Sequence, residues 1–149
     1  MGKKNTKQRA PSFPQKRTKQ ASDFINSDTQ IWVFNSVDRD GEFRFDVNRD
    51  DMCHKDVLDK IIHYNARTWA DILTETYGDS NKSKHHVLPY EHLSKGAKDR
   101  ITKLGLDDEC DSIFSMRLNN ITRILGFRYG QFFIVKWFDP NHGFCPSNK

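Results

Sequence analysis

The side chains best suited to act on a phosphate group are concentrated in residues 112–142. This segment reads as three short strands with four cationic residues and a trailing histidine: Arg117, Arg123, Arg128, Lys136 and His142. A guanidinium group binds phosphate through two hydrogen bonds and keeps its charge, so it can stabilise a pentavalent phosphoryl transition state. The pattern predicts a surface that grips and cuts a phosphodiester backbone. Ordinary arginines on the solvent face of a sheet are the alternative interpretation.

Imidazole titrates near neutral pH without tuning, so the six histidines are the candidate acid–base groups. His142 follows the turn sequence Asp139-Pro140-Asn141, where a side chain leaves the core at the end of a strand. His85 and His86 are adjacent in an extended segment, and adjacent side chains on a strand point to opposite faces. We therefore expect no metal site at this pair, whereas one of the two is a candidate for acid–base chemistry. Capping, structural or surface roles are the alternatives.

Other chemistry leaves no signature in the sequence. There is no P-loop, GxSxG or HExxH motif. Cys53, Cys110 and Cys145 are odd in number and widely spaced, which argues against a thiolate zinc site and a disulfide framework. We expect reduced thiols in the cytoplasm, no metal and no cofactor.

The strands that must position the cations form a predicted antiparallel meander, with turns at Asn119-Asn120 and Tyr129-Gly130. Strict alternation in the last strand places its apolar residues on two faces, with Phe132, Ile134, Lys136 and Phe138 on one and Phe133, Val135 and Trp137 on the other. Because both faces are apolar, we expect a central strand that is covered on both sides.

A β-hairpin is predicted upstream, from residues 31–34 and 42–47 joined through 38–41. Phe43, Phe45 and Val47 are its predicted inward residues.

Three helices are predicted between the hairpin and the meander. The first is capped by Asn48 or Asp50 and runs to about Tyr64, the second begins at Thr68 and stops at Gly78, and the third covers about residues 91–104. Their predicted apolar faces are Val57, Leu58, Ile61 and Ile62, then Trp69, Ile72, Leu73 and Tyr77, then Leu93, Ala97, Ile101 and Leu104. The predicted fold class is α+β, a mainly antiparallel twisted sheet with about three helices packed on it.

Charge is distributed unevenly along the 149 residues. Seven of the 24 Lys and Arg residues lie in residues 1–20, which contain no Asp or Glu, so the rest of the chain has 17 basic and 20 acidic residues. We predict a disordered basic tail over residues 1–22 and one domain over residues 23–149. The tail either adds salt-dependent affinity for nucleic acid or only solubilises the protein. No apolar run approaches 18 residues, and the N-terminus lacks the apolar stretch of a signal peptide, so we expect no membrane association.

The order of a helix, a meander with arginines on successive strands and a late histidine resembles the RelE/ParE superfamily of bacterial toxins. The residues that carry the resemblance are Arg117-Leu118, Arg123-Ile124 and the strand 132–137, within a match over roughly residues 91–145. The phrase WFDPNH, residues 137–142, also looks like the WWDP-H ending of small uncharacterised bacterial proteins.

The resemblance implies a cytoplasmic endoribonuclease that cleaves mRNA, often on the ribosome, and is restrained by an antitoxin protein. It implies a metal-independent reaction in which the 2′-hydroxyl group attacks the adjacent phosphate. Carried over, the resemblance makes Arg117, Arg123 and Arg128 hold the phosphate, the last two within the catalytic site. His142 or His85 acts as base or acid, and Lys136 adds positive charge.

This chain is longer than the usual toxin of that superfamily, and the superfamily includes members that are not nucleases. One rival interpretation is a non-catalytic module that binds RNA or a protein and shows steep salt dependence. Another is an accessory protein of a mobile element, which should expose an apolar patch to its partner.

Overall fold

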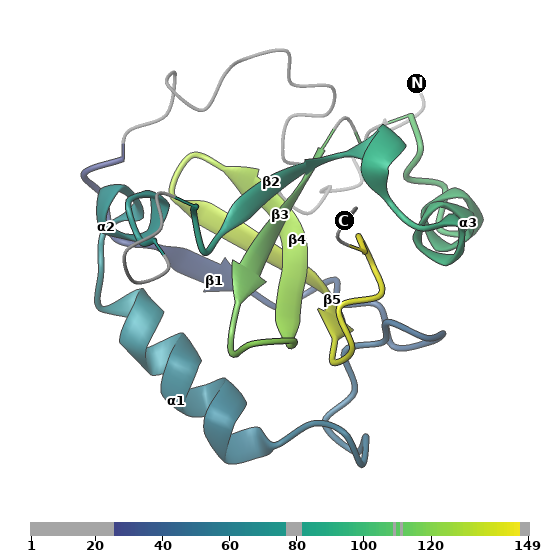
Figure 1. The fold of residues 1–149 in the computed structure, drawn as a ribbon, viewed down its shortest axis with the longest axis horizontal. Helices are drawn as coiled ribbons and strands as arrows, with labels where there is room; N and C mark the ends of the chain where they lie inside the picture. Colours follow the sequence, from purple (N-terminus) through teal and green to yellow (C-terminus); the bar gives the residue numbers. More distant parts are fainter. Residues whose placement is uncertain (1–25, 77–81, 109, 111, 147–149) are drawn as a thin grey trace, which may run out of the picture.

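The computed structural model describes residues 26–76, 82–108, 110 and 112–146, so the predicted tail lies outside the described residues. The elements are β1 (Ile31–Val33), α1 (His54–Asn65), α2 (Trp69–Leu73), β2 (His86–Pro89), a 3₁₀ turn (Tyr90–His92), α3 (Lys95–Lys103), β3 (Ser112–Arg117), β4 (Arg123–Tyr129) and β5 (Phe132–Asp139). The five strands form one sheet in the order β1-β5-β4-β3-β2 (Figure 1). Only the β1–β5 pairing is parallel among these strands. The predicted α+β class and the C-terminal meander are confirmed.

Two apolar clusters cover the two faces of this sheet, with α1 and α3 on opposite sides of it (Figure 1). On the first face, here called the α1 face, residues of α1 and α2 pack on alternate residues of the meander. Its buried members include Val57, Tyr64, Trp69, Ile72, Phe114, Met116, Ile124, Phe133, Val135 and Phe138. On the second face, the α3 face, they include Phe43, Leu93, Ala97, Ile101, Ile113, Leu125, Trp137 and Phe144. β5 is therefore covered on both sides, as predicted.

A β-bulge in β5 corrects the predicted alternation of that strand. Leu125 pairs with Trp137 whereas Gly126 pairs with Val135, so Lys136 is an extra residue opposite no partner in the register. As a result, Phe138 joins Phe133 and Val135 on the α1 face, whereas Trp137, predicted to share their face, packs in the cluster of the α3 face. Glycine is required at 126 because a Cβ atom there would lie 1.9 Å from the carbonyl oxygen of Ile134.

The predicted N-terminal hairpin is wrong. β1 pairs with β5 instead, and residues 42–47 contribute a single bridge from Arg44 to Trp137. Asp38, in the acidic segment 38–41 that was predicted to join the two strands of the hairpin, instead contacts residues far along the chain. Asp38 is buried, and its carboxylate accepts two hydrogen bonds of 2.6 Å from Arg100 of α3 and one of 3.0 Å from Trp137 Nε1. Val47, predicted to point inward, is 54% exposed.

The first helix begins later and buries less of its predicted apolar face than expected. α1 starts at His54 after Cys53, which makes no side-chain cap bond, so neither Asn48 nor Asp50 is its cap. It packs through a narrow stripe at i, i+4 and i+7 of Val57, Ile61 and Tyr64. Leu58 and Ile62, predicted in this stripe, are 57% and 60% exposed.

The second and third helices follow their local signals more closely. Thr68 and Asp71 form the capping box of α2, which ends at Leu73, and the predicted stop at 78 lies outside the described residues. α3 starts after Ser94, later than predicted, and Leu104 is 38% exposed rather than inward. Gly105 has a φ of +70°, which is typical of a residue that ends a helix.

Candidate functional site

One end of the α3 face gathers charged and titratable side chains from four strands. Arg117 at the end of β3 pairs with Arg123 at the start of β4, which in turn pairs with Asp139 at the end of β5. His86 of β2 pairs with Ser115, which pairs with Leu125 of the α3 face. Directly paired residues project from the same side of a sheet, so His86 is on the same face as the two arginines. The loop after β5 adds His142. We name His86, Arg123, Asp139 and His142 the His–Arg cluster.

The guanidinium groups of this region are held by the β3–β4 turn. Arg123 is 6% exposed, and it donates from Nη1 to the carbonyl oxygens of Asn119 (2.8 Å) and Thr122 (3.0 Å) and from Nη2 to that of Asn120 (3.3 Å). Arg117 donates from Nε to the Asn119 carbonyl oxygen (3.0 Å) and from Nη2 to Asn120 Oδ1 (2.6 Å). The turn carbonyls offset the repulsion between the two positive groups and fix their position.

Asp139 and His142 belong to one tight loop. The Asp139 carboxylate is buried and accepts hydrogen bonds from the backbone N–H groups of Gly143 (3.0 Å) and Phe144 (2.9 Å). His142 has a φ of +56°, and no other non-glycine residue in the described part of the chain has a positive φ. Such conformations are rare outside glycine and concentrate at functional sites.

The cluster perturbs its own histidines. Burial and the positive charge of Arg123 lower the pKa of His142, against an opposing effect of Asp139. Desolvation, Arg123 and His142 lower the pKa of His86. With an ordinary pKa near 6.5, both imidazoles are thus mainly neutral at pH 7, and an anion bound between them would favour protonation.

His85, predicted as an alternative base, lies on the opposite face from His86 and is buried against Tyr64. Its Nδ1 accepts from the Arg117 backbone N–H (3.0 Å), so its Nε2 carries the proton and donates to Glu75 (3.0 Å). Burial lowers its pKa to about 4. Glu75 also pairs with Arg67. Both ring nitrogens are thus engaged in joining β2, β3 and the segment after α2.

Arg128 and Lys136 are not brought to the cluster either. Arg128 lies at the far end of β4 on the α1 face, with its guanidinium 4.1 Å from the ring centroid of Trp69. It donates to the Gly130 carbonyl oxygen (2.9 Å) and to Asn26 Oδ1 (2.5 Å), and burial lowers its pKa to about 10. Lys136 is the bulge residue, and its Nζ donates to the Ser36 carbonyl oxygen (2.9 Å).

The sequence left the acid–base role open between the adjacent His85 and His86, and the resemblance then assigned it to His85 rather than to His86. The alternation of side chains along a strand could have distinguished the two histidines, since only one of two adjacent strand residues lies on the same face as Arg123. Which one it was depended on the β2–β3 register, and that register is set by contacts 29 positions apart in the chain, as in the pair His86 and Ser115.

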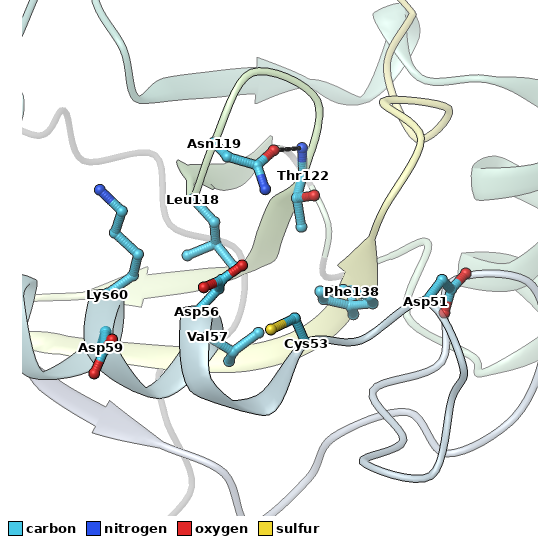
Figure 2. Close-up of a pocket in the computed structure, with 10 residues that line it drawn as sticks. All are labelled: Asp51, Cys53, Asp56, Val57, Asp59, Lys60, Leu118, Asn119, Thr122 and Phe138. Atoms are coloured by element: carbon cyan, nitrogen blue, oxygen red, sulfur yellow. Dashed lines mark hydrogen bonds between the residues drawn. The ribbon is translucent and has the colours of Figure 1, made fainter.

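A pocket of about 270 Å³ lies across the β3–β4 turn from the cluster, between that turn and the start of α1 (Figure 2). Its apolar floor is Val57, Leu118 and Phe138, which belong to the α1 face. Its rim carries Asp51, Cys53, Asp56, Asp59, Lys60, Asn119 and Thr122. Asn119 Oδ1 accepts from the Thr122 backbone N–H (2.8 Å), so this side chain closes the turn on the pocket side (Figure 2). The pocket contains none of the histidines.

No known family model matches this chain, and no curated protein or solved structure is significantly similar to it. Within the described residues, no three His, Cys, Asp or Glu side chains are arranged to hold a metal ion. No helix in that part of the chain is both long and apolar enough to cross a membrane.

Proposed function

We propose that this protein is an endoribonuclease that cleaves RNA without a metal, and that His86 and His142 are its acid–base pair. The observation that carries the proposal is that the strand register places His86 on the same face of the sheet as Arg123, and Arg123 opposite Asp139, whose loop carries His142, 56 positions after His86. The three groups lie near enough for their charges to act on one another. Transesterification of RNA needs a group to take a proton, a group to give one and a positive charge for the phosphorane. The His–Arg cluster contains all three.

We assign the base to His86 and the acid to His142, because Asp139 partly offsets the lowering of the His142 pKa by burial and Arg123, and thereby favours the protonated form of His142. His86 takes the proton of the 2′-hydroxyl group as that oxygen attacks phosphorus. His142 gives its proton to the 5′-oxygen as the P–O5′ bond breaks. The products are a 2′,3′-cyclic phosphate and a 5′-hydroxyl end, and the enzyme returns to its starting state when the two imidazoles exchange their protons with water.

Arg123 supports the developing negative charge of the phosphorane from a fixed position, since its guanidinium is anchored on the turn carbonyls. Arg117, anchored on the same turn, adds positive potential at this end of the sheet. Arg128 and Lys136 have no part in the proposed reaction.

The resemblance to the RelE/ParE superfamily supports a narrower proposal. We propose that the RNA substrate is mRNA, engaged in the cytoplasm and in part on the ribosome, and that an antitoxin protein restrains the enzyme. The toxin assignment rests on residues 91–145 only, and the cluster adds His86 from outside the loosely matched strands.

The direct test uses a fluorescent single-stranded RNA in EDTA, with the protein beside its His86→Ala, His142→Ala and His63→Ala variants. His63 is exposed on α1 and serves as the matched control. We expect cyclic-phosphate products with the parent and the control, and about 10²–10⁴-fold slower cleavage with either cluster variant. Binding of RNA without cleavage would replace this proposal with the non-catalytic RNA-binding module, and equal rates in all four proteins would exclude the cluster.

The acid and base roles are separable with a uridine 3′-(4-nitrophenyl phosphate) substrate, whose leaving group needs no proton. His142→Ala should then lose much less activity than on RNA, whereas His86→Ala should lose as much as before. The reverse pattern would exchange the two roles.

A further inference from the structure

The carboxylate of Asp139 is almost completely buried, at 2% exposure for the residue, and its oxygens face the backbone of the loop behind β5. Oδ1 accepts the N–H of Gly143 at 3.0 Å and approaches that of Asn141 at 3.4 Å, while Oδ2 accepts the N–H of Phe144 at 2.9 Å. Hydrogen bonds to a charged acceptor are stronger than those to a neutral one. Here three backbone N–H groups of one short loop point to the same carboxylate.

His142 lies between the bonded residues. Its φ of +56° is disfavoured for a residue with a Cβ atom, so the loop must be held for this conformation to persist. The bonds from Asn141, Gly143 and Phe144 bracket it on both sides. Beyond the loop, Phe144 is fully buried against Phe43 and Trp137, which fixes the far end.

We infer that Asp139 is a positioning residue of the proposed site: its carboxylate holds residues 140–144 in the conformation that keeps His142 next to the paired residues Arg123 and Asp139. The catalytic consequence rests on the proposed function. The positioning itself does not, because the conformation of the loop can be measured without any RNA.

The charge of Asp139 has a second effect at the same place. Arg123 lies directly opposite Asp139 in the β4–β5 register, and His86 approaches from β2. Against these groups Asp139 is the negative charge that favours protonation of His142, whereas it has no comparable effect on His86. Burial and, as the smaller cause, the negative charge of Asp139 raise the pKa of the Cys145 thiol.

The structural test is Asp139→Asn, which keeps the shape and one acceptor but places an amide N–H₂ where an oxygen accepted a backbone N–H. In NMR titrations we expect the pKa of His142 to fall below its parental value, while that of His86 moves less and serves as the internal reference. Hydrogen exchange of the Gly143 and Phe144 amides should accelerate. An unchanged His142 titration together with unchanged exchange at these two amides would overturn the inference.

The functional test is a double-mutant cycle with His142→Gly, since glycine accepts the positive φ and removes only the imidazole. We expect Asp139→Asn to lower kcat about 10–100-fold with KM within threefold, and to cost nothing further in the His142→Gly background. An equal loss in both backgrounds would mean that Asp139 only stabilises the fold, and would sink the positioning role.

If Asp139→Asn does not fold, Gly143→Pro replaces it. Proline removes the Gly143 N–H and disfavours the conformation of His142, while the carboxylate stays in place. The same non-additive loss is expected, and additivity would contradict the inference. If the parent protein cleaves no RNA at all, the proposed function fails, and the NMR titration and amide exchange still decide whether Asp139 holds His142.

Discussion

The two arginines of β4 are five residues apart on one strand, and they do different work. Arg123 lies on the α3 face opposite the buried Asp139, where its charge acts on His86 and His142. Arg128 lies on the α1 face, with its guanidinium 4.1 Å from the ring centroid of Trp69. Five is an odd separation, and side chains at odd separations leave opposite faces of a strand. The same alternation separates His85, which is hydrogen-bonded to Glu75 and to the backbone of β3, from His86, which lies on the same face as Arg123.

This difference shows that residue type alone predicts little about a phosphate site. Both arginines are cationic, partly or fully buried and hydrogen-bonded to backbone carbonyls. The two arginines differ in the residues around them, which are set by the pairing register of β4 with its neighbouring strands. The predictions below test whether the two ends of β4 are as independent as this arrangement implies.

The largest effect is expected from Gly126→Ala, which acts on the bulge between the two arginines. A Cβ atom 1.9 Å from the Ile134 carbonyl oxygen must push β4 and β5 apart, so we expect a loss of about 4 kcal/mol or more in the free energy of unfolding. Urea denaturation measures it. Gly130→Ala is the matched control, because its φ of +58° is strained for alanine but no atom lies within 4 Å of the added Cβ. Similar losses in the two variants would show that the bulge is not the constraint.

Arg123→Ala tests the cluster end. Loss of a fixed charge at a developing oxyanion typically costs about 10²–10³ in rate, so we expect kcat for RNA cleavage to fall by that factor per folded molecule. The carbonyl oxygens of the β3–β4 turn also lose their charged donor, which should lower the free energy of unfolding by about 1–3 kcal/mol. Steady-state kinetics at a temperature well below the midpoint of unfolding separates the two effects. Retention of full kcat would remove Arg123 from the mechanism.

His85 supplies a pH test on the α1 face. Its folded pKa of about 4 lies below the unfolded value near 6.5, so the unfolded state binds the proton first as the pH falls. Titration of His85 therefore leaves the free energy of unfolding unchanged above pH 6.5 and lowers it progressively between pH 6.5 and 4. The total loss is up to about 3 kcal/mol, at 1.4 kcal/mol per pKa unit. Urea midpoints across this range should fall less steeply for His85→Gln. Parallel curves for the two proteins would show that His85 is not the group responsible.

Arg128→Ala is expected to have the smallest effect. It removes the contact with Trp69 and the bonds to Gly130 and Asn26, which together are worth about 1–3 kcal/mol of stability. RNA cleavage per folded molecule should stay within threefold of the parent, in contrast to Arg123→Ala. A large fall in kcat with unchanged stability would place Arg128 at the substrate after all.

Local signals predicted the parts of the fold that depend on neighbouring residues. The meander followed from its turns, α2 from the Thr68 cap, and the end of α3 from Gly105. The N-terminal hairpin failed because Asp38 bonds Arg100, 62 positions away, rather than closing a local turn. The predicted apolar face of α1 was too wide, because the periodicity of apolar residues does not show how much of the helix surface the sheet covers.

The candidate site was likewise predicted where it depends on local sequence and missed where it depends on long-range pairing. Arg123 was identified as one of several arginines in the meander, and His142 from its place after the last strand. The structure places both at the same end of the sheet, because Arg123 pairs with Asp139, the last residue of β5. Arg128 and Lys136 were included because neither the β-bulge nor the opposite faces were considered, and parity alone would have separated Arg128 from Arg123. His86 required the β2–β3 register, which no short motif encodes.

The parallel pairing of β1 with β5 has a consequence for how the chain acquires its shape. Ile31 pairs with Phe132, about a hundred positions later, so β1 has no strand to join until β5 exists. Long-range pairings of this kind carry the largest closure entropy and form slowly, whereas the β3–β5 meander closes through short turns. On a translating ribosome β1 emerges early and waits, and the loop that holds His142 emerges only after β5. Any activity that depends on that loop is therefore absent from every shorter nascent chain.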